Sequence, residues 1–285
     1  MGHSDIVWVH APTVGGDIRL SPDGPHAERQ GRPLNRLMLG AKAFPHQSLF
    51  PLKGGNRMTL QVTWYSHACL MIDTGDAKLI VDPFLTGNPL APVSADEVEA
   101  DYILVSHGHG DHVGDTVAIA KRTGATVISN FEIHNWLVGQ GLEKAHPQHI
   151  GGGFDFPWGR VKLTIAHHGS SLPDGSYGGN PCGFLFYIQG RKIYHACDTG
   201  LFYDMKLIGE EGIDLAVLPI GDNFTMGPED SLRAVQLIAP RQVLPIHYDT
   251  FDVIQQDAAA WKTRVEDETA ARVALLKPGE TLDLS

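Results

Sequence analysis

The stretch Val105–Asp115 reads VSHGHGDHVGD and concentrates three histidines and one aspartate in His107–His112. It begins at the last residue of DYILV, residues 101–105, an apolar run of the kind that forms a buried strand. A His-rich surface loop is the alternative, but the pattern H-x-H-x-D-H rarely arises by chance at this composition. The stretch therefore indicates a metal site at the end of a strand.

His107 and His109 stand two residues apart, so in an extended chain their side chains point the same way and can share one ion. The intervening glycines are expected to permit sharp turns that bring Asp111 and His112 to an adjacent ion. Imidazole nitrogen and carboxylate oxygen are ligands for zinc, and they also bind manganese, iron and nickel. The spacing thus predicts part of the coordination of two neighbouring ions.

Further ligands are expected where other apolar strands end. The run TIAHHG offers His168 or its neighbour His167, HACDTG offers Asp198, and LPIHYD offers His247. Each run comes before a polar or glycine turn, and sites in α/β proteins assemble at such strand ends. We expect these side chains to converge on one pocket with the first cluster.

Composition bounds the class of protein. The 285 residues are 42% apolar and 19% charged, with a formal net charge of -11, which is ordinary for a soluble globular protein. The acidic balance argues against a nucleic-acid or anionic-membrane partner, and we find neither a membrane-length apolar run nor a secretory signal. Three widely spaced cysteines, Cys69, Cys182 and Cys197, argue against a disulfide framework and for the cytoplasm.

The pattern of the chain changes near Met58. Residues 1–57 are rich in Pro and Gly and show no sustained period, so they form either a mobile or peripheral extension or a mis-assigned start, with Met58 as the true initiator. Residues 58–285 are expected to form the folded domain that contains the metal site. They begin with three short β runs, a predicted meander.

Strands and helices alternate after the meander, which favours sheets packed between helices. One helix is expected over residues 112–124, ended by Gly124. The run Gly151–Gly153 lacks dinucleotide-binding spacing and is interpreted as a flexible connection. Residues 272–284 are expected to form a closing pair of strands.

The order of these motifs, H-x-H-x-D-H followed by a distal His, Asp and His, resembles the metallo-β-lactamase superfamily. Within it, the phrases DPFLTGNP, YHACDTGLFYDM, LPIGDNFTMGPEDS and PIHYDTF resemble the UPF family of metal-dependent hydrolases. The resemblance covers residues 58–285. It implies an α/β fold, an αββα sandwich of two mixed β-sheets flanked by helices.

The resemblance also implies a dinuclear site with two divalent ions, Zn²⁺ first, with Mn²⁺, Fe²⁺ or Ni²⁺ as alternatives. The implied ligands are His107, His109 and His168 for the first ion, Asp111, His112 and His247 for the second, and Asp198 between them. His168 is preferred to His167 because a serine turn follows the ligand closely in the family. Here a glycine separates the two, so His167 stays open.

The implied activity is hydrolysis, in which a metal-bridging hydroxide attacks a small ester, lactone, amide or phosphoester. Asp111 would orient the hydroxide. His67 is the first candidate for the proton donor and Asp222 is a possible carboxylate that supports the ligands. Their structural alternatives are a supporting histidine and a cap for the loop before the helix that begins at Pro228. His195 stands three residues before Asp198 and is expected to pack elsewhere.

Two other functions remain possible from the sequence. A nuclease-type phosphodiesterase fits the superfamily, but the acidic balance and the short path from His112 to His168 disfavour it. A metal-binding sensor without turnover is the alternative outside enzymes. The expected partner is a small-molecule substrate, with no nucleic acid or membrane, and the sequence leaves a homo-oligomer open. The thiol of Cys197 is interpreted as a buried small group rather than a sensor.

Overall fold

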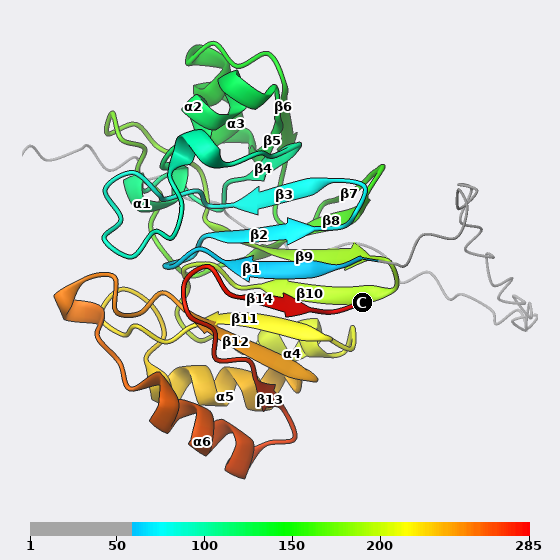
Figure 1. Ribbon diagram of the computed structural model, residues 1–285, viewed down its shortest axis with the longest axis vertical. Helices are drawn as coiled ribbons and strands as arrows, with labels where there is room; N and C mark the ends of the chain where they lie inside the picture. The colour runs from blue at the N-terminus through cyan, green and yellow to red at the C-terminus, as the bar shows by residue number, and fades with distance from the viewer. Residues whose placement is uncertain (1–58) are drawn as a thin grey trace, which may run out of the picture. The chain divides into compact units, whose positions relative to one another are not determined.

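The computed structural model describes residues 59–285; the predicted extension over residues 1–57 lies outside them. Two seven-stranded sheets form the centre of this part of the chain (Figure 1). Sheet A contains, in spatial order, β14 (Thr281–Asp283), β1 (Gln61–Trp64), β2 (Leu70–Asp73), β3 (Lys78–Val81), β4 (Tyr102–Leu104), β5 (Thr126–Asn130) and β6 (Ala145–Gln148). Sheet B contains β13 (Arg272–Val273), β12 (Gln242–Ile246), β11 (Leu215–Pro219), β10 (Arg191–His195), β9 (Cys182–Ile188), β8 (Gly159–Ile165) and β7 (Gly153–Phe156).

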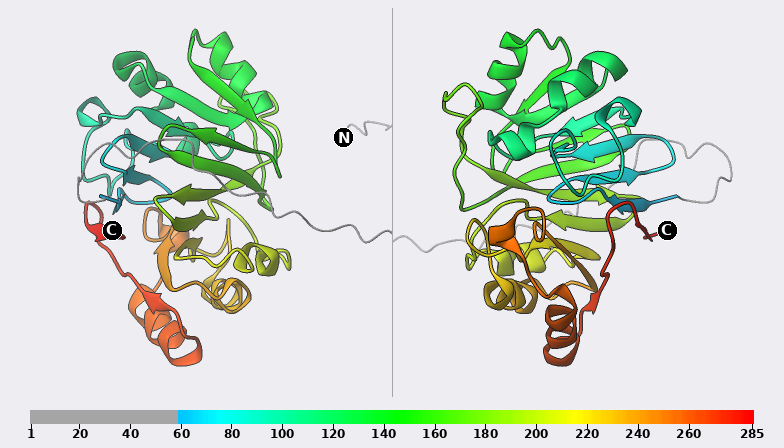
Figure 2. Two further views of the ribbon diagram at one scale, coloured as in Figure 1. Left: turned by 90° about the vertical axis from the view of Figure 1, so that its right-hand side faces the viewer. Right: turned by 60° about the vertical axis from the view of Figure 1, so that its left-hand side comes forward.

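Helices cover the outer faces of both sheets, as the turned views also show (Figure 2). They are α1 (Gly110–Val113), α2 (Thr116–Thr123), α3 (Phe131–Gly139), α4 (Met205–Gly209), α5 (Pro228–Ile238) and α6 (Ala258–Glu268), with short 3-10 turns η1 (Ala95–Glu97) and η2 (Asp252–Ile254). Helices α2 and α3 contact sheet A, whereas α5 contacts β11 of sheet B and packs against α4 and α6. The predicted αββα sandwich with two mixed sheets is confirmed.

The central strands are apolar on both sides because both faces of each sheet are covered. Along β3, Leu79 and Val81 point into the core between the sheets, whereas Ile80 points into the core under α2 and α3. In β4, Leu104 and Ile103 divide in the same way. This two-sided burial explains why DYILV and its neighbours show continuous rather than alternating apolar character.

The loops that contain the predicted ligands lie at one edge of each sheet because the strands before them run in the same direction. In sheet A, β1, β3, β4, β5 and β6 all run the same way, and in sheet B β8, β10, β11, β12 and β13 do so. The carboxyl ends of codirectional strands meet at one edge of a sheet. Every predicted ligand follows the carboxyl end of one of these strands.

The prediction of one continuous helix over residues 112–124 is wrong. The segment is divided into α1 and α2 at Gly114, whose φ is 40°. A Cβ atom on Gly114 would collide with the carbonyl oxygen of Pro83, so the two loops approach each other as only glycine allows. The Asp115 carboxylate then accepts hydrogen bonds from the amides of Leu85 and Thr86, at 3.0 and 2.8 Å, and fixes the two loops together.

Two other expectations are corrected. The run Gly151–Gly153 is not a flexible connection, because the first two glycines exchange backbone hydrogen bonds with Leu163 and Gly153 begins β7. The closing strands do not pair with each other: β13 pairs with β12 in sheet B, and β14 pairs with β1 in sheet A. The carboxyl-terminal segment therefore ties the two sheets together.

The end of α5 yields a stability prediction. Its carboxyl cap, Ala239, is exposed and adopts a left-handed conformation, with φ 48° and ψ 53°. Glycine avoids the Cβ strain there, so Ala239→Gly should raise the free energy of unfolding by about 0.5–1 kcal/mol. Ala118→Gly, at an exposed position within α2, should lower it by a similar amount. Urea denaturation measures both; equal destabilisation by the two changes would contradict the assignment.

Candidate metal centre

The first ligand group follows β4 and β8. His107 and His109 come from the loop after β4, and His168 follows β8. One ligand atom from each of the three lies within 4.8 Å of the others, and His107 Nε2 is 3.0 Å from His109 Nδ1. The fold therefore brings the three histidines predicted for the first metal ion together.

The second group joins α1 to the ends of β1 and β12. Asp111 and His112 lie on α1, His247 follows β12, and His67 follows β1. Their ligand atoms also lie within 4.8 Å of one another. The group contains the three predicted ligands of the second ion together with His67, whose ring centroid is 3.9 Å from that of His247.

Asp198, after β10, lies between the groups. Its Oδ2 atom is 3.5 Å from His168 Nε2 of the first group, and 3.3 and 3.0 Å from Nε2 of His112 and His247 of the second. Asp198 is thus in reach of side chains from both groups. The assignment of each ligand to a particular ion stays a prediction.

Unpartnered polar atoms show that this cluster suits a cation. Within residues 59–285, the buried atoms His112 Nε2, His247 Nε2 and Asp198 Oδ1 have no hydrogen-bond partner, although the first two lie close to the Asp198 carboxylate. Leaving a buried polar atom unpaired costs about 1–3 kcal/mol. Imidazole and carboxylate atoms directed at one point are a fitting donor set for a divalent metal ion, which would satisfy them together.

Electrostatics agree with this interpretation. Burial lowers the pKa of His107 far below its usual value, with His112 adding to the effect. Burial raises the pKa of Asp198, but His112 and His247 outweigh it and hold the carboxyl pKa well below its usual range. For His112, burial is opposed by Asp198 and Asp82, which raise its pKa well above the usual value.

Comparisons with known proteins identify the family. Residues 70–248 match the model described as a beta-lactamase superfamily domain. A UPF0173 metal-dependent hydrolase from Heliobacterium modesticaldum is 53% identical over 234 residues, covering 79% of this chain and 98% of the relative. The corresponding hydrolase from Thermus thermophilus is 49% identical over 225 residues, covering 79% and 99%. The chain belongs to the UPF0173 family of metal-dependent hydrolases.

A solved structure supports the same conclusion. Igni18, a novel metallo hydrolase from the hyperthermophilic archaeon Ignicoccus hospitalis, matches with a TM-score of 0.73 and 34% sequence identity, covering 80% of this chain and 99% of that one. The resemblance inferred from the motifs is confirmed, and with it the metal-dependent hydrolase activity of the superfamily. No helix within residues 59–285 is long and apolar enough to cross a membrane.

Sequence reasoning missed Asp82, which holds the hydrolase's second ligand group in place. This fully buried residue follows β3, and its Oδ2 lies 2.9 Å from His112 Nδ1 and accepts a 2.6 Å hydrogen bond from the Ser106 hydroxyl. Its Oδ1 accepts from the Ser106 amide at 2.8 Å. A carboxylate behind a ligating histidine fixes the ring and its tautomer. The signal was present in VDPF: an acid at the end of an apolar strand, like the predicted ligands.

Several residues of the centre adopt strained backbone conformations. His67, Asp82, Cys197 and His247 have φ between 45° and 56°, in the left-handed region that side chains other than glycine disfavour. Each such residue costs about 1–3 kcal/mol, which the surrounding packed sheets must offset. Strain of this kind concentrates at functional sites, because it aims side chains where regular backbone would not.

The structure separates the two adjacent histidines. His168 belongs to the first ligand group, whereas the exposed His167 stacks on Phe202, with ring centroids 5.1 Å apart and planes at 2°. His195 is fully buried, as its spacing from Asp198 predicted: Nε2–H donates to the carbonyl of Ala68 at 3.0 Å, and Nδ1 accepts from the Cys197 amide. The geometry thus favours His168 and gives His195 a packing role.

Asp222 lies apart from the ligand groups. It is exposed, and within the described residues its carboxylate hydrogen bonds only to the amide of Asn223. It therefore shapes the turn before α5, in accord with its structural alternative.

Cys197 is completely buried, and burial raises the pKa of its thiol well above the usual value, so it is an unreactive packing group.

The glycines of the histidine loop do not act as expected. Neither Gly108 nor Gly110 has a positive φ, so neither supplies a turn that other residues disfavour. A Cβ atom on Gly108 would lie 3.0 Å from the carbonyl carbon of Ser171, which shows that this glycine admits a neighbouring loop. Asp111 and His112 reach the second group because α1 begins at Gly110.

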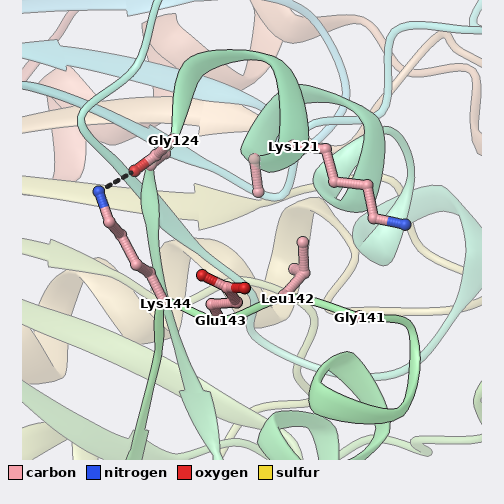
Figure 3. Close-up of a pocket in the computed structure, with 8 residues that line it drawn as sticks. Lys121, Gly124, Gly141, Leu142, Glu143 and Lys144 are labelled. Carbon is pink, nitrogen blue, oxygen red and sulfur yellow. Dashed lines mark hydrogen bonds between the residues drawn. The ribbon is translucent and has the colours of Figure 1, made fainter.

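Two cavities differ in their relation to the centre. One, of about 410 Å³, is lined by His168 itself. Another, of about 220 Å³, is lined by residues that include Lys121, Glu143 and Lys144 and is shown in Figure 3. The second lies before β5 and β6, at their amino ends, whereas the ligands follow carboxyl ends. Only the first cavity adjoins the metal ligands.

The role of Asp82 leads to a metal-binding prediction. Asp82→Asn removes the charge behind His112 while keeping the size of the side chain, so Zn²⁺ affinity should fall about 10–100-fold. Competition with a chromogenic chelator measures it. Asp96→Asn, at an exposed acid of η1, is the matched control and should keep the wild-type affinity. Equal affinity in both variants would remove Asp82 from the site.

The buried His195 predicts part of the pH dependence of stability. Burial lowers its pKa from 6.5 to about 4. Between pH 6.5 and about 4, His195 binds a proton in the unfolded state but not in the folded state. This residue therefore lowers the free energy of unfolding by up to about 3 kcal/mol at low pH. In metal-free protein, His195→Gln should flatten the fall in unfolding free energy between pH 7 and 4. Parallel pH curves for wild type and variant would contradict the prediction.

Proposed function

We propose that this UPF0173 hydrolase binds two divalent ions, Zn²⁺ first, and cleaves a small ester, lactone, amide or phosphoester. The observation that carries the proposal is the position of Asp198 Oδ2, within 3.5 Å of imidazole nitrogens from both ligand groups. A single carboxylate between two groups of three or more donors is suited to a pair of ions rather than one.

The ligands would divide as the motifs implied. His107, His109 and His168 would hold one ion, Asp111, His112 and His247 the other, and Asp198 both. Bound divalent ions supply Lewis acidity and lower the pKa of water to about 7. The protein supplies orientation: Asp82 fixes His112 from behind, and the packed strand ends fix the remaining ligands.

His67 is the proposed hydrogen-bond donor to the leaving group. Its Nε2 lies 3.3 Å from Asp111 Oδ2, and because a carboxylate only accepts, this nitrogen carries the hydrogen. Nδ1 then accepts from the Thr250 hydroxyl at 3.1 Å. Burial lowers the pKa of His67 to about 4, with His247 adding to the effect, so the ring is neutral near pH 7 and keeps one proton at Nε2. This N–H faces the second ligand group, where it would donate a hydrogen bond to the leaving oxygen, and the proton that this oxygen takes would come from the attacking water.

The decisive test is hydrolysis by protein loaded with Zn²⁺ or Mn²⁺. The panel contains a lactone, a thioester, an aryl ester, an amide and a phosphodiester, each with and without chelator. We expect a chelator-sensitive rate on at least one class, reduced at least about 100-fold in Asp198→Ala. Asp96→Ala, at an exposed acid, should keep the rate. Two bound ions without turnover on any class would favour a sensor.

The same assay separates His67 from Asp222. His67→Gln should lower kcat about 100-fold with metal content unchanged, because the proton at Nε2 is lost. Asp222→Asn should change kcat less than about threefold, because its carboxylate contacts only the Asn223 amide. The reverse ranking would transfer the donor role to Asp222.

A further inference from the structure

The cavity beside His168 has a wall without formal charge. Its apolar lining comes from the end of β8, the start of the β9 segment and the β6–β7 loop: Ile150, Ile165, Ala166 and Pro181. Ile165 is 39% exposed although it is large and apolar. Single exposed apolar side chains are common, but this one lines a cavity, so an apolar group bound there would cover it and gain free energy.

Two of the polar side chains of this cavity already have partners within the protein. The ring of His167 stacks on Phe202, and Asn180 Oδ1 accepts a 3.3 Å hydrogen bond from the Tyr177 hydroxyl. The cavity volume of about 410 Å³ falls within the range of about 300–1,000 Å³ typical of small-molecule sites. It is therefore large enough for part of a substrate whose reacting bond lies at the ligands.

The loops nearest the ligand groups lack basic side chains. The loops after β3, β4, β8, β10, β11 and β12, taken as residues 82–94, 105–115, 166–181, 196–204, 220–227 and 247–257, contain no Lys or Arg, whereas the loop after β13 contains the exposed Lys277. They do contain the buried carboxylates of Asp82 and Asp198. A phosphoester would find no basic side chain in these loops to balance its charge, whereas a neutral carboxylic ester needs none.

We propose that this cavity is an acyl subsite and that the hydrolase acts on uncharged carboxylic esters or lactones with an apolar chain or ring. The inference rests on the proposed hydrolysis and narrows its substrate class. In the reaction, the oxygen of water forms a bond to the acyl carbon, the acyl C–O bond breaks, and the leaving oxygen takes a proton. The products are a carboxylic acid and an alcohol, joined in one molecule for a lactone.

The first test measures chain-length dependence. Zn²⁺-loaded protein is assayed with the p-nitrophenyl esters of acetic, butyric, hexanoic and octanoic acids, and with bis(p-nitrophenyl) phosphate. Burying one methylene group is worth up to about fourfold in kcat/KM, so we expect a rise of about two- to fourfold per methylene until the cavity is filled. The phosphodiester should be slower than every ester.

A matched pair of variants locates the effect. Ile165→Ala should reduce the gain per methylene to less than about 1.5-fold while leaving acetyl ester hydrolysis nearly unchanged. Leu275→Ala removes an apolar side chain of similar exposure, 38%, that does not line the cavity, and it should keep the wild-type dependence. Equal chain-length dependence in both variants would overturn the assignment of the subsite.

A second measurement is independent of turnover. The uncharged ketone 2-octanone resembles an ester but cannot be hydrolysed, and it is titrated into metal-free protein labelled at isoleucine δ1 methyl groups. We expect the Ile165 signal, assigned through Ile165→Val, to shift with 2-octanone and not with acetone. An unmoved Ile165 signal at saturation would contradict binding in this cavity.

The outcomes separate the two proposals. Ester hydrolysis without chain-length dependence would overturn the acyl subsite and leave the hydrolase proposal standing. Turnover of the phosphodiester alone would overturn the subsite and assign the activity to phosphoesters. A shift of Ile165 with no turnover of any ester would support the apolar subsite while removing ester hydrolysis from the proposed function.

Discussion

The buried carboxylate of Asp198 imposes the main constraint on this structure. One of its oxygens lies 3.0–3.5 Å from three imidazole nitrogens that follow β8 and β12 and belong to α1. Two of these nitrogens and the other carboxylate oxygen have no hydrogen-bond partner within residues 59–285. Such an arrangement is costly in a buried site unless cations bind, so the fold is organised around a charge that the protein itself does not provide.

The sandwich meets this constraint through rigidity. Because both faces of each sheet are packed, the strand ends can hold His67, Asp82 and His247 in left-handed backbone conformations that a mobile loop would relax. The segment between β13 and β14 adds a tie between the sheets, and therefore between the two halves that contribute ligands. Stability elsewhere in the fold offsets strain at the centre.

The surroundings of the centre have a consistent electrostatic character. Buried carboxylates orient and join the imidazoles, while the six loops after β3, β4, β8, β10, β11 and β12 contain no basic side chain and the cavity beside His168 is largely apolar. Bound cations would offset the negative charge of the buried acids. A neutral, partly apolar substrate suits such a site better than a polyanion, and this links the acidic composition of the chain to its proposed chemistry.

The sequence by itself determined the fold class, the family and the residues of the ligand groups. Metal ligands must be His or acidic side chains at fixed strand ends, and local spacing such as H-x-H-x-D-H records that requirement directly. Only the tertiary structure brought His168 rather than His167 into the first ligand group, revealed Asp82 behind His112, and placed Asp222 in an exposed turn. It also divided the predicted helix at Gly114 and sent the last two strands to different sheets. These features depend on contacts between loops distant in sequence, such as Gly114 against Pro83, and local patterns do not encode such contacts.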